Sequence, residues 1–212
     1  MKIILLGPPG SGTSTSSSIL NPMLDLPHIS SGNICEENIL KKTPLGIKIQ
    51  KIYDIGGLIP DDMAIDMIIN RLKEPDCKKG FVLDGFPRSV KQAKALDKFT
   101  KTDFFIYFNV PEWLIIKRLT SRVTCKNCKK SYNLIILKPK KEGICDLCGG
   151  KLIKRGDDNT KSIKNRFRVF EKKTKPVLEY YKKKGMFNSI TCDKLDVSPE
   201  ENVKKILKLI RK

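Results

Sequence analysis

The sequence predicts an α/β fold in which helices cover both faces of a central parallel sheet. Short apolar runs alternate with helical patterns along the chain, and the first run leads directly into a glycine-rich turn. The 212 residues suit one compact body with an insert, or two small domains, and are enough to bury a core. Hydrophobic residues make up 40% and charged residues 31% of the chain, which excludes a wholly disordered protein.

Each expected strand is a short apolar run, and the expected strands are 1–6, 81–84, 104–108 and 187–191. Helices are expected between and after them, at 31–42, 44–55, 61–73, 89–99, 111–121, 160–184 and 199–211. Pro111 and Pro199 fall where the first turn of a helix tolerates proline. A weaker helix from Thr13 is rich in Ser and Thr, and Pro22 is expected to end or kink it near Leu20.

The chain carries 42 basic and 23 acidic residues, a net charge of +19. Such a charge fits a nucleic-acid or polyphosphate partner, or a general preference for lysine on solvated faces. Lysine accounts for 34 of the basic residues and arginine for 8, which favours the second interpretation and makes each arginine position informative. No apolar run reaches the roughly 18 to 20 residues that span a bilayer, so we expect a cytoplasmic protein without a membrane partner.

Four of the seven cysteines form two C-x-x-C pairs that are separated by sixteen residues. Two such pairs can surround one tetrahedral ion, and thiolates suit zinc, whereas disulfides or a chance spacing are the alternatives. The sequence predicts a structural zinc site with the ligands Cys125, Cys128, Cys145 and Cys148. The other three cysteines lie in apolar surroundings and are expected to be buried: Cys35, Cys77 and Cys192.

The first strand leads into the turn Gly7-Pro8-Pro9-Gly10-Ser11-Gly12-Thr13-Ser14-Thr15. A strand, a glycine loop and a helix start are the setting of a phosphate-binding loop, where glycines let backbone N–H groups surround phosphate oxygens. A hydroxyl at the end of such a loop usually contacts the magnesium ion. Thr13 departs from the standard loop, which has Lys there, and a plain strand-to-helix turn is the alternative interpretation.

Further motifs give the sequence a resemblance to a known family. It resembles adenylate kinase, a nucleoside monophosphate kinase, of the type with a zinc-bearing lid, from Met1 to about Arg211. Besides the glycine turn and the cysteine pairs, the matching runs are Ile29-Ser30-Ser31-Gly32, Gly57-Leu58-Ile59-Pro60-Asp61, Asp84-Gly85-Phe86-Pro87-Arg88 and Arg155-Gly156-Asp157-Asp158. The Asp-Gly-Phe-Pro-Arg run is the most specific of them.

The resemblance implies a three-layer P-loop fold with a core at 1–30, 74–121 and 159–212. It further implies a helical AMP-side insert at 31–73 and a small β-rich zinc lid at 122–158. The implied reaction transfers a phosphoryl group reversibly from ATP to AMP and gives two ADP. The implied cofactors are structural Zn²⁺ in the lid and Mg²⁺ with ATP, and the implied partners are ATP, AMP and ADP. We expect a monomer without a specific nucleic-acid partner.

The resemblance also assigns site residues. Five of the eight arginines match phosphate-binding positions: Arg88 holds the acceptor, Arg118 and Arg122 face the donor phosphates, and Arg155 and Arg166 move in with the lid. Such convergence suits the charge that develops in phosphoryl transfer, although surface ion pairs are the alternative. The resemblance assigns Asp84 to organising magnesium. This assignment depends on the Gly85-Phe86-Pro87-Arg88 run that follows, because an isolated Asp at the end of a strand usually only caps it.

The donor nucleotide is assigned to Gly10, Ser11, Gly12, Thr13, Ser14, Thr15, Arg118, Arg122, Ser131 and Tyr132. The acceptor is assigned to Ser31, Glu36, Gly57, Leu58, Ile59, Gly85, Arg88, Gln92, Arg155 and Arg166. Asp157 and Asp158 are expected to brace the closed lid through arginine pairs, or to form a solvated acidic turn.

Several positions depart from the family pattern. Thr13 replaces Lys, Glu36 replaces an Arg that holds the AMP phosphate, and Asn33 replaces Asp. Ser14 and Ser16 stand in place of Gly and Gln. Losing one preorganised donor costs about 10²–10³ in rate, and losing a cation on the transferred phosphate costs roughly 10³–10⁵. Glu36 would repel the acceptor phosphate or pair with Arg88.

Three hypotheses follow from these departures. The first is an adenylate kinase with reduced turnover, which the retained arginines favour. The second is a degenerate relative that binds nucleotide or serves as a zinc-stapled scaffold, which the lost Lys and Arg favour. The third, a basic zinc-ribbon protein that binds nucleic acid, lacks aromatic residues for base stacking near the ribbon, where Tyr132 stands alone.

Overall fold

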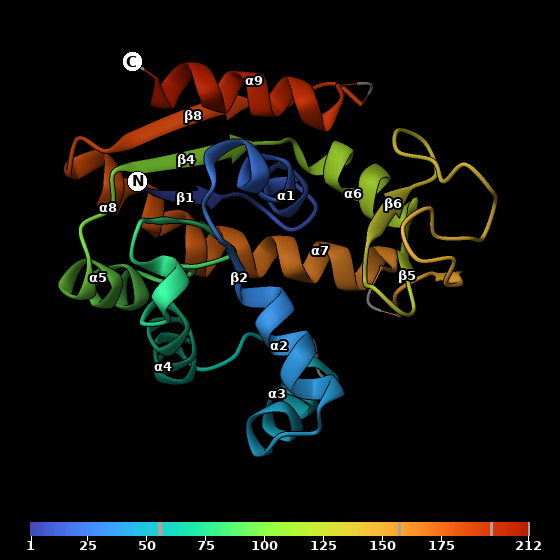
Figure 1. Ribbon diagram of the computed structural model, residues 1–212, viewed down its shortest axis with the longest axis horizontal. Helices are drawn as coiled ribbons and strands as arrows, with labels where there is room; N and C mark the ends of the chain where they lie inside the picture. Colours follow the sequence, from blue (N-terminus) through green and yellow to red (C-terminus); the bar gives the residue numbers. More distant parts are fainter. Residues whose placement is uncertain (55–56, 157, 196, 212) are drawn as a thin grey trace.

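The computed structural model describes residues 1–54, 57–156, 158–195 and 197–211, and it has the predicted α/β fold (Figure 1). Within this part of the chain, the main sheet has five strands in the order β2–β3–β1–β4–β8, and all neighbouring strands are parallel. The strands are β1 (Lys2–Leu6), β2 (His28–Ser30), β3 (Phe81–Asp84), β4 (Phe104–Asn109) and β8 (Phe187–Thr191).

Helices cover both faces of the sheet, and successive side chains of a strand point to opposite faces. Ile3 and Leu5 pack toward α1 (Thr13–Leu24), α6 (Glu112–Thr120) and α9 (Pro199–Ile210). Ile4 and Leu6 belong to the cluster on the other face, with residues of α4 (Asp61–Leu72), α5 (Val90–Phe99) and α8 (Lys175–Lys183). The three-layer arrangement places the carboxyl ends of β1, β2 and β3 side by side.

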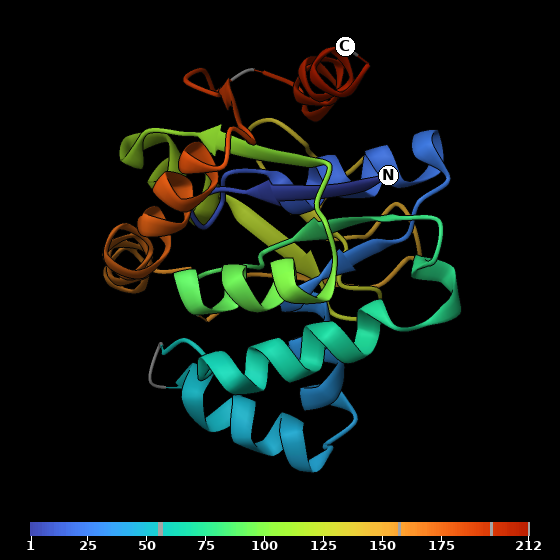
Figure 2. The same cartoon turned by 90° about the vertical axis from the view of Figure 1, so that its left-hand side faces the viewer.

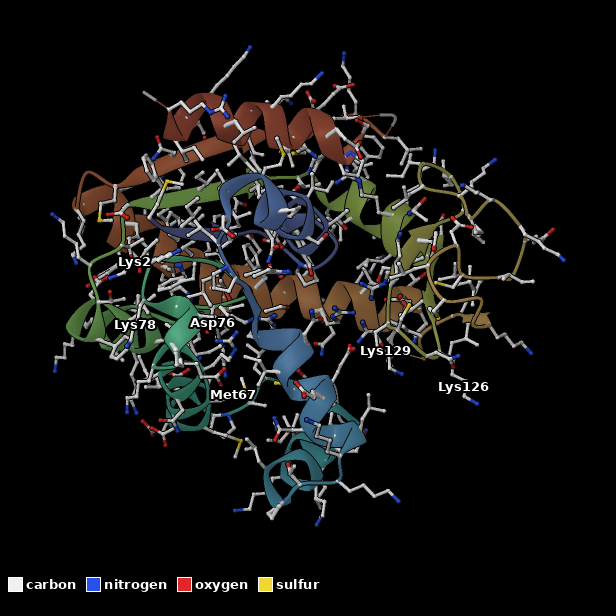
Figure 3. The ribbon with its side chains drawn as sticks, viewed as in Figure 1. Lys2, Met67, Asp76, Lys78, Lys126 and Lys129 are labelled. Atoms are coloured by element: carbon white, nitrogen blue, oxygen red, sulfur yellow. The ribbon has the colours of Figure 1, made fainter. Side chains whose placement is uncertain are left out.

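The 31–73 segment forms α2 (Ser31–Leu40), α3 (Pro44–Asp54) and α4, which project from one side of the sheet (Figure 2). The hydroxyl of Ser30 caps α2 by accepting the N–H of Asn33 at 3.4 Å. Cys35 Sγ lies 3.8 Å from Sδ of Met67, which is labelled in Figure 3, so α2 packs directly on α4. The insert therefore shares its core with the sheet.

The 122–158 segment contains a second, antiparallel sheet of three described strands in the order β6–β5–β7. These are β5 (Arg122–Cys125), β6 (Ser131–Asn133) and β7 (Leu152–Ile153). Val123, Tyr132 and Leu152 bury their side chains with Cys125 and Cys145 in a core of their own. The helix α7 (Thr160–Val169) leads back to the main body.

Two of the expected helices differ from those in the structure. The helix α1 continues past Pro22 to Leu24, so the expected end near Leu20 is wrong. Pro22 stands in the last turn, where it removes one hydrogen bond, and the left-handed Asp25 closes the helix by donating its N–H to the Asn21 carbonyl. The expected helix 160–184 is instead divided into α7, a π-helical turn (Phe170–Thr174) and α8. Pro176 follows the turn and cannot donate an N–H to the preceding turn of helix.

The strand β2 was not expected from the sequence, because its three residues are too few to show a pattern. A 3₁₀ turn (Pro75–Cys77) precedes β3. The expected helix 44–55 ends at Asp54, and its last position lies outside the described residues. Among the helices that the structure describes, none combines the length and the apolar character needed to cross a bilayer.

Candidate active site

The glycine turn between β1 and α1 has the backbone of an anion-binding loop. Gly10 and Gly12 have φ of 81° and 96°, in the left-handed region that favours glycine. A Cβ at Gly10 would lie 2.7 Å from Cγ of Leu119 in α6, so the loop and α6 approach too closely for any other residue. The Ser11 N–H donates to the Pro8 carbonyl at 3.0 Å, and α1 begins at Thr13. The loop therefore places the N-terminus of α1 near the carboxyl end of β1, where the partial positive charge of the helix can attract an anion.

Arg118 from α6 supports this loop from below. Its Nη1 donates to the Ser11 carbonyl at 3.2 Å and its Nη2 to the Lys194 carbonyl at 3.4 Å. The residue is only 8% exposed, and this burial lowers the pKa of Arg118. Its Nε is buried and has no hydrogen-bond partner among the described residues.

The first turns of α1 are unusual in burying hydroxyls. The Oγ atoms of Ser16 and Ser17 are buried and lack hydrogen-bond partners among the described residues. Thr13 and Thr15 are half-buried, and Ser14 is exposed. Burying an unpaired hydroxyl costs free energy. These serines therefore stabilise the packing of α1 on the core less than apolar side chains at the same positions would.

Asp84 ends β3 beside this loop. Its carboxylate is 5% exposed, accepts a hydrogen bond from Ser30 Oγ at 3.3 Å, and lies 3.8 Å from His28 Nε2. Leu5 of β1 and Ser30 of β2 both pair in register with Asp84, which places it among three neighbouring strand ends. The carboxyl ends of parallel strands are the usual ligand side of an open α/β sheet.

The Gly85–Arg88 turn connects β3 with helices α2 and α5. The Gly85 carbonyl accepts bonds from Ser31 Oγ at 2.8 Å and from Arg88 Nε at 2.7 Å. Gly85 has φ of 74°, and a Cβ there would lie 2.6 Å from Ser31 Oγ. The structure thus brings Ser31, Gly85 and Arg88 together and orients the Arg88 side chain.

Gln92 lies one helical turn beyond Arg88 and is buried. Its Oε1 accepts the Arg88 N–H at 2.7 Å, and its Nε2 donates to Asp61 Oδ1 at 2.8 Å. The amide therefore joins α5 to the start of α4. The loop Gly57–Ile59 precedes α4 and is half-buried, with Ile59 packed on the core beneath α2.

Arg122 and Arg166 converge on Asp158, whose side chain is 3% exposed. Arg122 donates from Nε and Nη2 to both carboxylate oxygens at 2.7 Å, and Arg166 Nη1 lies 3.6 Å from Oδ1. Asp158 is thus an arginine brace, as one of the two interpretations predicts, and not a solvated turn. Asp157 lies outside the described residues.

Glu36 and Arg155 form an ion pair that sequence reasoning missed. Arg155 Nη2 donates to Glu36 Oε1 at 2.5 Å, across 119 residues of chain. The suggested pairing of Glu36 with Arg88 is therefore replaced by one with Arg155. Burial raises the pKa of the neighbouring Cys35 thiol. No local pattern in the sequence could have indicated this partner.

The two predicted residues of β6 differ in their surroundings. Ser131 is exposed and opposite Thr124 in the sheet. Tyr132 is 3% exposed, its Oη accepts the Asp146 N–H at 2.8 Å, and it lies 3.5 Å from Cys145 Sγ. The structure therefore directs the Tyr132 hydroxyl toward the cysteines.

The four clustered cysteines form a compact thiol site. Their Sγ atoms lie within 4.8 Å of one another, and no disulfide joins any of the seven cysteines. Two matching turns build the site: the Cys125 N–H donates to the Lys130 carbonyl at 2.9 Å, and the Cys145 N–H to the Gly150 carbonyl at 2.8 Å. Lys126 and Lys129, labelled in Figure 3, belong to the first turn. The predicted burial of Cys35, Cys77 and Cys192 is confirmed.

One cavity shares none of these residues. It measures about 610 Å³, lies between α6 and α7, and is lined by Glu112, Lys164, Phe167, Arg168, Glu171 and Lys172. None of them touches the glycine turn or the strand ends in the contacts described above, so we do not assign this cavity to the reaction.

Comparison with known proteins identifies the family. The sequence model of the adenylate kinase family matches residues 5–186. The adenylate kinase of Clostridium tetani is 45% identical over 98% of each chain, and that of Thermosipho melanesiensis is 44% identical over the full length of both. The adenylate kinase of Methanocella arvoryzae is 46% identical over 92% of each chain. By the extent of these matches the chain belongs to the adenylate kinase family, whose members transfer a phosphoryl group between ATP and AMP.

Proposed function

We propose that this protein transfers a phosphoryl group reversibly from ATP to AMP, giving two ADP, and that Thr13 and Glu36 reduce its turnover. The observation that carries the proposal is the convergence of three features at neighbouring strand ends. These are the left-handed glycines of the turn, the Arg118 contact with Ser11, and the buried carboxylate of Asp84. Phosphoryl transfer depends on such positioning and charge stabilisation, with little covalent chemistry by the protein.

On the donor side, backbone N–H groups of the glycine turn bind the ATP phosphates, with Thr13, Ser14 and Thr15 supplying hydroxyls. Arg118 adds a cation beneath the turn, where its burial strengthens a charge-assisted bond. Arg122 approaches from β5. Ser131 contributes a contact from the lid, and Tyr132, whose hydroxyl accepts the Asp146 N–H, contributes one through its backbone.

On the acceptor side, Arg88 binds the AMP phosphate, because its Nε bond to the Gly85 carbonyl holds the guanidinium in one orientation. Gln92 recognises the adenine by exchanging its bond with Asp61 for one with the base. Ser31, Gly57, Leu58 and Ile59 pack around the ribose and base. Arg155 and Arg166 act on the phosphates from the lid side.

We assign the core to 1–30, 74–121 and 159–212, the AMP-side insert to 31–73 and the lid to 122–158. The brace of Arg122 and Arg166 on Asp158 stabilises the junction where the lid meets α7. Closing the lid over ATP excludes water, so the phosphoryl group passes to AMP instead of being hydrolysed. The monomeric state, the cytoplasmic location and the lack of a specific nucleic-acid partner stay predictions.

The residues near the loop fit magnesium, which accompanies ATP in this family. Asp84 offers a carboxylate, and Ser14 and Thr15 offer hydroxyls, which are the oxygen ligands that this ion prefers. When bound, the ion neutralises charge on the donor phosphates. Ser30 holds the Asp84 carboxylate in place by donating from its hydroxyl.

The cysteine site fits structural zinc. A Zn–S bond of about 2.3 Å places tetrahedral sulfurs about 3.8 Å apart. The Sγ atoms of Cys125 and Cys148, and of Cys128 and Cys145, are each separated by 3.5 Å. Four thiolates leave no open position, so the ion would hold the two turns of the lid together without taking part in the reaction.

The proposal is tested by a coupled assay of ADP formation from ATP, AMP and magnesium, with Thr13→Lys beside the unmodified protein. An ammonium at position 13 would reach the donor phosphates, and we expect kcat to rise about 10²-fold. The matched control is Met23→Lys, which adds the same charge to an exposed position of the same helix and is expected to leave kcat unchanged.

Equal kcat for Thr13→Lys and the unmodified protein, with both active, would show that turnover is not limited by the missing Lys. Inactivity of both would lead to Glu36→Arg in the Thr13→Lys background. If that double variant also forms no ADP, while calorimetry detects nucleotide binding, the protein is a degenerate binder and the proposed catalysis is wrong.

A further inference from the structure

The ion pair between Glu36 and Arg155 joins two separate parts of the chain. Glu36 lies on α2 in the AMP-side insert, whereas Arg155 lies between β7 and α7 in the lid. Their side chains are 24% and 32% exposed, so the pair is partly desolvated yet still reached by water. An ion pair at such a position can exchange partners when a competing anion arrives.

The pair stands where charge matters for the reaction. Glu36 lies on α2, and the first residue of this helix, Ser31, bonds the same Gly85 carbonyl as Arg88, so the carboxylate lies on an element that borders the proposed acceptor-phosphate site. Glu36 supplies a negative charge to Arg155 through this pair. A phosphate that binds Arg155 through Nη2 competes with this carboxylate, and the free energy of the pair is then subtracted from the free energy of binding.

We propose that Glu36 is a clasp that competes with the acceptor phosphate for Arg155 and holds the lid against α2 while AMP is absent. This inference rests on the proposed function, because it assigns Arg155 to nucleotide phosphate. The ion pair protects the lid of the free protein from hydrogen exchange by some factor. By linkage, it weakens AMP binding by that same factor.

The experiment uses Glu36→Gln, which keeps the shape of the side chain and removes its charge. The matched control is Glu37→Gln on the same helix, because Glu37 is exposed and pairs with Lys41 within α2. Two quantities are measured for each variant: amide hydrogen exchange of residues 151–156 in the nucleotide-free protein, and KM for AMP at saturating ATP. Circular dichroism checks that both variants fold.

For Glu36→Gln we expect exchange of this segment to accelerate about five-fold and KM for AMP to fall about five-fold. Glu37→Gln is expected to change neither. In an Arg155→Gln background, Glu36→Gln should have no further effect on exchange, since the partner is already absent. These three results together support the clasp.

Exchange that is the same in Glu36→Gln and Glu37→Gln would overturn the clasp. Faster exchange with an increased KM for AMP would also overturn it, because Glu36 would then position Arg155 for the phosphate instead of competing with it. If exchange is faster in Glu36→Gln but neither the unmodified protein nor any variant forms ADP, the proposed function is refuted. The clasp is still tested in that case, because hydrogen exchange detects it without turnover.

Discussion

Two buried hydroxyls at the start of α1 show how single residues set the stability of the nucleotide loop. Ser16 and Ser17 face the core on the first turns of the helix, and their Oγ atoms find no partner among the described residues. An unpaired hydroxyl loses its bonds to water without replacement. The composition of this helix suggested weakness through low propensity, whereas the structure adds burial of unpaired polar atoms as a second cause.

We predict that Ser17→Ala increases the free energy of unfolding by about 1 kcal/mol more than Ser18→Ala does. Both changes raise helix propensity equally, but Ser18 is exposed and its hydroxyl donates to the Thr15 carbonyl. Urea unfolding of the two variants measures the difference. A smaller free energy of unfolding for Ser17→Ala than for Ser18→Ala would show that the Ser17 hydroxyl has a bonding partner in solution.

At the scale of elements, local sequence predicted the strands that are long enough to show a pattern. The runs that became β1, β3, β4 and β8 were all expected, but the three residues of β2 were not, because so short a strand depends on its neighbour β3. Proline positions predicted the ends of helices less well than apolar runs predicted the strands. Pro22 is tolerated in the last turn of α1, whereas Pro176 follows a π-helical turn that divides an expected continuous helix.

The cysteine site gives a prediction for the lid as an element. The small sheet has a core of few side chains, so we expect it to depend on the zinc crosslink. Removing metal with a strong chelator should accelerate hydrogen exchange in 122–158 at least about ten-fold while β1 and β4 stay protected. Cys148→Ser should show the faster exchange without chelator and respond little to it. Unchanged exchange in the lid after chelation would contradict the zinc assignment.

At the scale of the whole molecule, the chain carries a net charge of +19. Such a charge attracts any polyanion and speeds the encounter with nucleotides, without specifying sequence. The family relationship explains the site, and the excess of lysine over arginine is spread along many elements. Charge alone is therefore no sign of a nucleic-acid function.

We predict that any binding of duplex DNA or RNA is non-specific and falls about 10³-fold or more between 50 and 200 mM salt. Fluorescence anisotropy with two unrelated sequences measures both the salt dependence and the specificity. The control is KM for ATP in the same buffers, which should change far less because the nucleotide is held by short-range bonds. Binding that distinguishes the two sequences and persists at 200 mM salt would revive the nucleic-acid hypothesis.

The sequence by itself determined the features whose residues are neighbours along the chain: the glycine turn after β1, the Asp84–Arg88 run and the two cysteine pairs. Their chemistry follows from spacing, because a short segment has few ways to place its own backbone. Only the tertiary structure decided which distant charges meet. Glu36 was expected to repel phosphate or to pair with Arg88, yet it contacts Arg155 across 119 residues. Long side chains on separate elements choose partners by how those elements pack, and no local pattern records that choice.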